Sequence, residues 1–113
     1  MRQDFSFGKA KRVLKREDFA RIKSKGSRKT SRNFILLQLA NKIGEKRLGI
    51  IVTKKVGKST IRSKWKRCLR EFFRLNQELF QKSTDNVFIV KSGSKFRRGS
   101  RSLQEELRTL VSR

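Results

Sequence analysis

The segment from Ile61 to Phe80 constrains the fold more than any other, because its apolar and basic residues separate onto different faces of a helix. The steps between apolar residues are mostly three or four positions, which predicts an amphipathic helix with one side in a core. Basic residues recur at every fourth position on another side, which we call the cationic stripe. The apolar set is Ile61, Trp65, Cys68, Leu69, Phe72, Leu75 and Leu79, and the stripe is Arg62, Lys66, Arg70 and Arg74, with Arg67 beside them.

Like charges four residues apart repel each other in an isolated helix. A polyanion lying along the stripe would remove this repulsion, whereas a plain solvated basic helix would have to tolerate it. A disordered arm would have no reason to keep its apolar residues in register. The pattern therefore favours an ordered helix that binds a polyanion, with a solvated surface helix as the simpler alternative.

The overall charge indicates the same kind of partner. The chain has 113 residues, with 32 Lys and Arg against nine Asp and Glu, and a formal net charge of +23. Because the basic residues are spread along the whole length, we expect the folded body to be cationic and nucleic acid to be its partner. A membrane surface is the lesser option, since the helix needs its apolar face for the core. We expect one domain over residues 1–113, with 1–13 as a flexible or docked arm.

The hydrophobic pattern predicts an α+β fold, with a small mixed sheet packed with helices in the order α-β-β-α-β-α. A crossover unit forms if the third strand lies parallel to the second, and its default sense would be right-handed. Ser59 or Thr60 is a candidate N-cap for the long helix. The expected helices are 15–26, 59–80 and 101–112, the expected strands are 33–40, 47–55 and 86–91, and 27–32 is expected to be a polar connector.

The side chains that usually catalyse reactions are scarce. The chain has no histidine, and its one cysteine, Cys68, falls on the apolar helix face. Nucleophilic catalysis ordinarily needs a base beside the nucleophile, and the nine carboxylates do not form sets spaced for metal binding. We therefore expect neither a nuclease acting by its own side chains nor a cofactor on the protein alone. No apolar run reaches transmembrane length and no signal segment is visible, so we expect a cytoplasmic protein.

Residues 47–74, RLGIIVTKKVGKSTIRSKWKRCLREFFR, resemble the signature of the bacterial ribonuclease P protein subunit. That signature runs R-x-G, a strand, K-K-x-G, and then R-N-R-x-K-R-x-x-R followed by Glu or Gln. The stretches RVLKREDFARIKSKG, NFILL and DNVFIV resemble the family's first helix, first strand and third strand. The resemblance covers nearly the whole chain. The matching signature residues are Arg47, Gly49, Lys54, Lys55, Gly57, Arg62, Lys66, Arg67, Arg70 and Glu71.

The resemblance implies a left-handed β-α-β crossover, against the default sense, and an accessory subunit of an endoribonuclease. Such a subunit binds a catalytic RNA, which uses magnesium ions to remove the 5′ leader from precursor tRNA. The protein also contacts the leader, in a cleft between the sheet and the first two helices. Neither a membrane nor DNA is an expected partner. The implied contacts to the RNA subunit are Lys54, Lys55, Arg62, Ser63, Lys64 and Arg67, and the implied leader-cleft residues are Phe19, Lys23, Leu37, Lys66 and Arg70.

Four positions depart from the family pattern. Ser63 and Lys64 replace Asn and Arg, so the amide's hydrogen-bonding groups are lost and Lys64 cannot make a planar bidentate phosphate contact. Lys23 stands where a second aromatic residue is common, and Leu37 where some members have tyrosine. Stacking on the leader would therefore rest on Phe19, with Lys23 holding phosphate instead.

Two alternatives stay open. Phe19 is either a packing residue between the first helix and the sheet or a platform on which an unpaired base stacks. The whole chain is either the ribonuclease P subunit or a structural RNA-binding protein, such as a ribosomal one, which needs no cleft for a single strand. A DNA-binding protein would place the basic helix in a major groove, whereas Trp65 and its apolar neighbours predict that this helix packs on its sheet.

Overall fold

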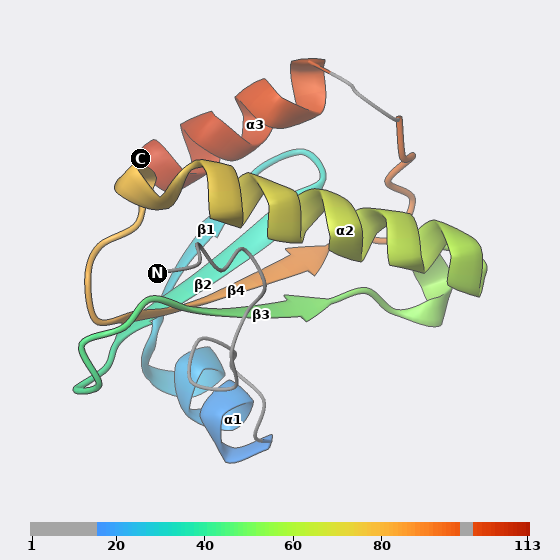
Figure 1. Cartoon of the computed structure of the whole chain (residues 1–113). Helices are drawn as coiled ribbons and strands as arrows, with labels where there is room; N and C mark the ends of the chain where they lie inside the picture. The colour runs from blue at the N-terminus through green and yellow to red at the C-terminus, as the bar shows by residue number, and fades with distance from the viewer. Residues whose placement is uncertain (1–15, 98–100) are drawn as a thin grey trace, which may run out of the picture.

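The computed structural model describes residues 16–97 and 101–113 (Figure 1). The expected arm, residues 1–13, lies outside the described residues. Each predicted helix and strand forms, with boundaries shifted by a few residues. The elements are α1 (Arg16–Lys25), β1 (Ser27–Thr30), β2 (Phe34–Ala40), β3 (Arg47–Ile51), a 3-10 turn η2 (Lys54–Val56), α2 (Ser59–Leu75), a 3-10 turn η3 (Gln77–Leu79), β4 (Thr84–Val90) and α3 (Arg101–Ser112).

The strands form one sheet in the order β1-β2-β4-β3. The central pair, β2 and β4, is antiparallel, with Phe34 opposite Val90. The outer strand β1 pairs antiparallel with β2, and β3 pairs parallel with β4. Because β3 and β4 are parallel, the chain between them crosses over one sheet face through α2, as predicted for this segment. The left-handed sense of the crossover stays a prediction.

Helices cover both faces of the sheet (Figure 1). On one face, α2 and α3 bury the larger core, in which the ring of Trp65 is fully buried and meets the Phe34 ring edge-on at 5.6 Å between centroids. On the other face, α1 buries a smaller cluster of Ile22, Leu37 and Val87. The period-2 alternation along β2 explains this division, since successive side chains point to opposite faces.

Gly26 ends α1 at a point where the backbone of the helix and that of β2 come very close. A Cβ atom there would lie 2.6 Å from the carbonyl oxygens of both Gln38 and Ile22. Since such contacts are far inside van der Waals distance, only glycine fits without a shift of backbone. This approach holds α1 against the small cluster and fixes its position on the sheet.

Three local predictions were wrong. The polar connector contains β1, an edge strand whose exposed, charged residues gave no apolar alternation. The N-cap of α2 is Lys58, without a side-chain cap hydrogen bond, so Ser59 and Thr60 already lie in the helix. Leu75, assigned to the apolar face, is 64% exposed, because the buried side of α2 turns toward Phe73 instead.

Candidate nucleic-acid interface

The cationic stripe lies on the part of α2 that faces away from the core. Its ends have local partners: Arg62 Nε donates to the Gly57 carbonyl at 3.2 Å, and Arg74 Nε donates to the Glu71 carboxylate at 3.0 Å. Within the described part of the chain, Lys66, Arg67 and Arg70 pair with no carboxylate. The middle of the stripe therefore offers three cations that no carboxylate of residues 16–97 or 101–113 neutralises.

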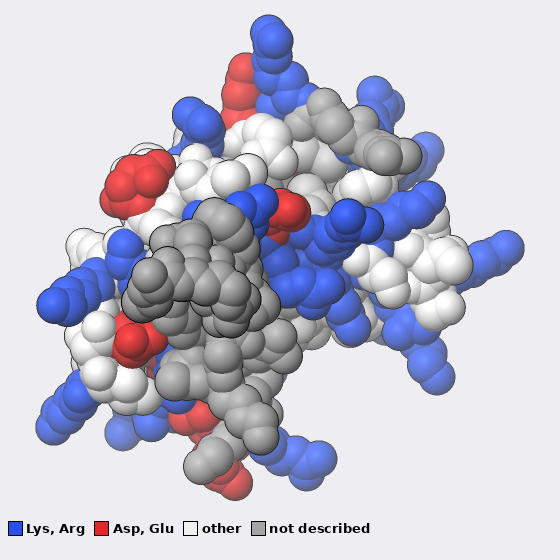
Figure 2. Space-filling view, in the orientation of Figure 1, with Lys and Arg blue, Asp and Glu red and all other residues white. Residues whose placement is uncertain are grey.

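One flank of α2 overhangs the outer strand β3. Near the start of α2, Arg62 Nε donates to the carbonyl of Gly57, which follows η2. Beyond the end of α2, Lys46 Nζ, just before β3, donates to the Gln77 carbonyl. Since residues advance by 100° in an α-helix, Lys66 and Arg70 lie on the same flank as Arg62. Figure 2 shows a continuous group of Lys and Arg atoms in the region where Figure 1 draws α2 over β3.

The residues that the resemblance assigns to the RNA subunit form one surface. Lys54 and Lys55 are exposed on η2, directly before α2. On the first turns of α2, Ser63 and Lys64 are exposed and Arg62 is half-buried. Further along α2, the other assigned residue is Arg67, which is exposed. The surface therefore runs from η2 along the N-terminal half of α2.

The residues assigned to the leader cleft do not all gather on one face. Phe19, half-buried, packs with the buried Leu37 in the small cluster under α1, and Lys23 is exposed one helical turn after Phe19. Lys66 and Arg70 belong to α2, on the opposite face of the sheet. Leu37 is buried under α1, and a strand of RNA that touches the other four must pass around the edge of the sheet.

A buried ionic network joins α1 to the sheet, and the sequence analysis did not detect it. The carboxylate of Asp85 has no exposed surface and accepts hydrogen bonds from Arg47 Nε at 2.7 Å and Arg47 Nη2 at 2.8 Å. It also accepts from Asn41 Nδ2 at 2.8 Å and Arg21 Nη2 at 3.3 Å. Arg47, the first residue of the signature, therefore has a structural partner rather than an open RNA-facing position.

The network keeps Asp85 ionised. Burial opposes the charge, but the hydrogen bonds from Arg47 and Asn41 and the nearby guanidinium groups outweigh it and hold the pKa of Asp85 below its ordinary value. In return, the hydrogen bond to Asp85 raises the pKa of Arg47. The pair joins residues 38 positions apart. The sequence offered one signal for this network: Asp85 is a carboxylate directly before the third predicted strand, 86–91.

Other kinds of site find little support. The described residues contain no group of three or more His, Cys, Asp or Glu side chains placed to hold a metal ion. Cys68 is half-buried, and this burial raises the pKa of its thiol. None of the helices in the described ranges is long and apolar enough to cross a membrane.

Comparisons with known proteins all lead to one family. The family model described as ribonuclease P matches residues 7–113. A ribonuclease P protein component of Geotalea uraniireducens is 38% identical over 111 residues, which cover 96% of this chain and 97% of that protein. The one of Syntrophus aciditrophicus is 38% identical over 86 residues, 76% of this chain and 72% of that protein.

Solved structures agree in fold. The ribonuclease P protein of Thermotoga maritima superposes with a TM-score of 0.81 at 35% identity, covering 89% of this chain and 94% of that one. The ribonuclease P protein of Staphylococcus aureus superposes with a TM-score of 0.82 at 34% identity, covering 91% of this chain and 94% of that one. The similarity thus extends over the sheet and the helices that carry the candidate interface.

Proposed function

The chain belongs to the ribonuclease P protein family, and on this premise we propose that it binds a catalytic RNA and helps this RNA remove the 5′ leader from precursor tRNA. Membership makes it a protein component of a ribonuclease that processes tRNA. The proposal adds the division of labour: the RNA subunit carries out the cleavage with magnesium ions, and the protein supplies binding. We propose that this processing of precursor tRNA takes place in the cytoplasm.

The observation that carries the proposal is the arrangement of α2. Its apolar side is packed in the larger core, while Lys66, Arg67 and Arg70 on its other side pair with no carboxylate in the described ranges. Cations on a rigid helix attract phosphate groups and release the counterions that surround RNA. The protein would therefore lower the repulsion between the catalytic RNA and the phosphates of its substrate.

The proposed leader site extends from the α1 side of the sheet around its edge to α2. Phe19 offers a half-buried ring for stacking on an unpaired base, and Lys23, one turn later, offers an ammonium group for a phosphate. Lys66 and Arg70 would hold further phosphates where the strand passes β3. Contacts between Lys or Arg and phosphate do not depend on base sequence, so a site built mainly from Lys and Arg would accept leaders of any sequence.

Reconstitution tests the function directly. The protein is added to the catalytic RNA and precursor tRNA of one of the relatives at low magnesium concentration, where the RNA alone is slow, and leader removal is measured. We expect faster cleavage at the mature 5′ end with protein, and none from rigorously RNA-free protein. A basic protein of similar size serves as the control for unspecific charge effects. Equal stimulation by this control would favour a structural RNA-binding protein instead.

A further inference from the structure

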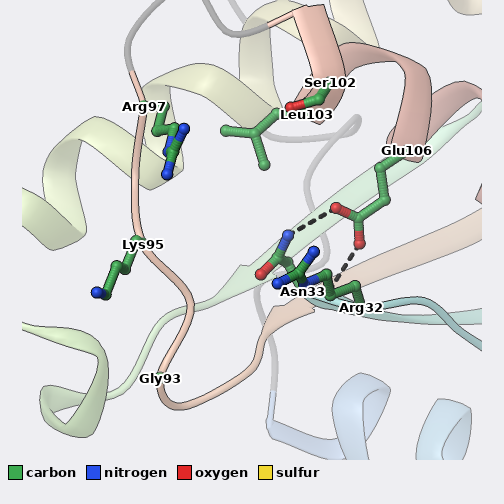
Figure 3. Close-up of a pocket in the computed structure, with 8 residues that line it drawn as sticks. All are labelled: Arg32, Asn33, Gly93, Lys95, Arg97, Ser102, Leu103 and Glu106. Carbon is green, nitrogen blue, oxygen red and sulfur yellow. Dashed lines mark hydrogen bonds between the residues drawn. The ribbon is translucent and has the colours of Figure 1, made fainter.

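A second basic site lies away from the cationic stripe, at a pocket of about 610 Å³. Its walls come from the turn between β1 and β2, from residues 93–97 after β4, and from the first turns of α3 (Figure 3). Three cationic side chains line it: Arg32 from the first wall, and Lys95 and Arg97 from the second. None of the roles assigned above uses these residues.

The first wall is held by a single carboxylate. Glu106 of α3 accepts hydrogen bonds from Asn33 Nδ2 at 2.7 Å and from the Asn33 backbone N–H at 2.6 Å, and also from the Ser31 hydroxyl. Figure 3 shows the carboxylate directed at Asn33 from α3. Because these donors engage both oxygens, Glu106 serves to fix the turn that carries Arg32.

The second wall is fixed as well. Gly93 adopts a φ of +87° in the turn after β4, a conformation that suits glycine, and Ser94 Oγ donates to the Asn33 carbonyl at 3.3 Å. The ring of Phe96 meets the Trp65 ring edge-on, with 5.2 Å between centroids. The connection that carries Lys95 and Arg97 is therefore tied both to the first wall and to α2.

The pocket has an excess of positive charge. Arg32, Lys95 and Arg97 are exposed and, among the described residues, pair with no carboxylate. Three cations against the one carboxylate of Glu106 leave a formal charge of +2 in the pocket lining. Cations that line one pocket raise its positive potential, and an anion bound there lowers the electrostatic free energy.

We propose that this pocket binds a backbone phosphate of the catalytic RNA, as a contact separate from the surface on η2 and α2. The inference rests on the function proposed above. Its occupant follows from position: Phe96 places the pocket beside Trp65 of α2, on the α2 and α3 side of the sheet, whereas Phe19 and Lys23 lie under α1. One RNA lying on the N-terminal half of α2 thus continues onto the pocket, while the leader, held at Phe19 and Lys23 on the other face, reaches the α2 side only at Lys66 and Arg70.

The test is the salt dependence of binding to the catalytic RNA by a double variant, Arg32→Ala with Lys95→Ala. One phosphate contact adds about 0.7 to 0.9 to the slope of log affinity against log salt, so loss of this contact should make the slope smaller by roughly 0.7 to 0.9. The matched control is Lys82→Ala with Arg108→Ala, which removes one Lys and one Arg that are exposed outside the pocket. The control should keep a slope near that of the wild type.

A third variant separates charge from shape. Arg32→Lys with Lys95→Arg keeps both charges and should bind like the wild type, and melting temperatures of all variants should agree because the replaced side chains are exposed. A titration of the free protein with inorganic phosphate, followed by amide NMR shifts of Gly93 and Lys95, reports the site without RNA. We expect these shifts in the wild type and not in the double alanine variant.

Three outcomes would overturn the proposal. Equal slopes for the double variant and its control would mean that the pocket contacts no phosphate. A loss confined to precursor tRNA, with unchanged affinity for the catalytic RNA, would assign the pocket to the substrate. A double variant whose melting temperature falls, with no recovery in the charge-keeping variant, would make these residues structural. Failure of the proposed function looks different, since the wild type itself would then neither bind the catalytic RNA nor stimulate it.

Discussion

Single side chains have sharply different tasks in this protein, although most of the charged ones are basic. The guanidinium of Arg47 donates to the buried carboxylate of Asp85, and that of Arg62 donates to the Gly57 carbonyl. Arg70 is exposed and has no acidic partner in the described ranges. Residue type alone therefore does not identify the RNA-binding positions. Burial and existing partners decide which cations remain available to a phosphate.

Asp85→Asn should destabilise the fold strongly. The variant leaves the mostly buried Arg47 with only the more distant carboxylate of Asp18, at 3.8 Å, and removal of one member of a buried ion pair typically costs about 3 to 5 kcal/mol. Urea unfolding measures the loss. Glu78→Gln, which removes an exposed carboxylate, is the control and should change the free energy of unfolding little. A near-normal stability of Asp85→Asn would show that the network contributes little.

The same pair predicts a pH dependence. Because the pKa of Asp85 is lowered in the folded state, its contribution is complete above the ordinary value of 3.8 and is lost as the pH falls through the lower, folded value. The stability difference between wild type and Asp85→Asn should therefore be constant from about pH 5 to 8 and shrink below about pH 4. A difference that shrinks near neutral pH would contradict this assignment.

Phe19→Ala separates packing from leader binding. The ring is only half-buried, so the loss of stability should stay below the value of about 3 to 5 kcal/mol that is typical when a fully buried Phe is truncated to Ala. Lost stacking should weaken binding of precursor tRNA to the reconstituted enzyme by about 1 to 3 kcal/mol and leave mature tRNA unaffected. Ile22→Ala, which empties a fully buried position on the same helix, is the control. Equal weakening toward both tRNAs would make Phe19 a packing residue.

At the scale of elements, α2 and α3 followed from the sequence, whereas β1 did not. The two helices repeat apolar residues every three or four positions, a local signal that survives without tertiary contacts. The short β1 has exposed basic residues and exists because β2 offers it a partner edge. The leader site was only partly predictable for the same reason: which sheet face receives Phe19, and which receives Lys66, depends on the crossover and not on local spacing.

On α2, Arg62→Ala should weaken binding of the catalytic RNA. A charge-assisted hydrogen bond contributes about 1.5 to 3 kcal/mol, so the dissociation constant should rise roughly 10- to 150-fold at fixed salt. Lys64→Arg should bind equally or more tightly, because a guanidinium can make the paired phosphate contact. The control is Arg28→Ala, which removes an exposed charge on β1. Normal binding by Arg62→Ala would remove this residue from the interface.

For the whole molecule, the net charge of +23 makes ionic strength the main control of assembly. Five implied cations contact the RNA subunit, so the slope of log affinity against log salt should be at least about 3.5. Filter binding or fluorescence anisotropy over a range of potassium chloride concentrations measures it. Mature tRNA, a polyanion that carries no leader, provides the reference. A slope near zero would exclude the cationic surface as the place where RNA binds.

The strand order has a consequence for the newborn chain. β4 is synthesised last of the four strands but lies between β2 and β3 in the sheet. Its residue Val90 pairs with Phe34 of β2, which is 56 positions earlier in the chain. During translation, β2 and β3 are therefore synthesised well before the strand that joins them, and contacts so distant in sequence close slowly. Until β4 is in place, the unpaired apolar strands can aggregate with those of other chains. The electrostatic repulsion between strongly basic chains opposes this aggregation.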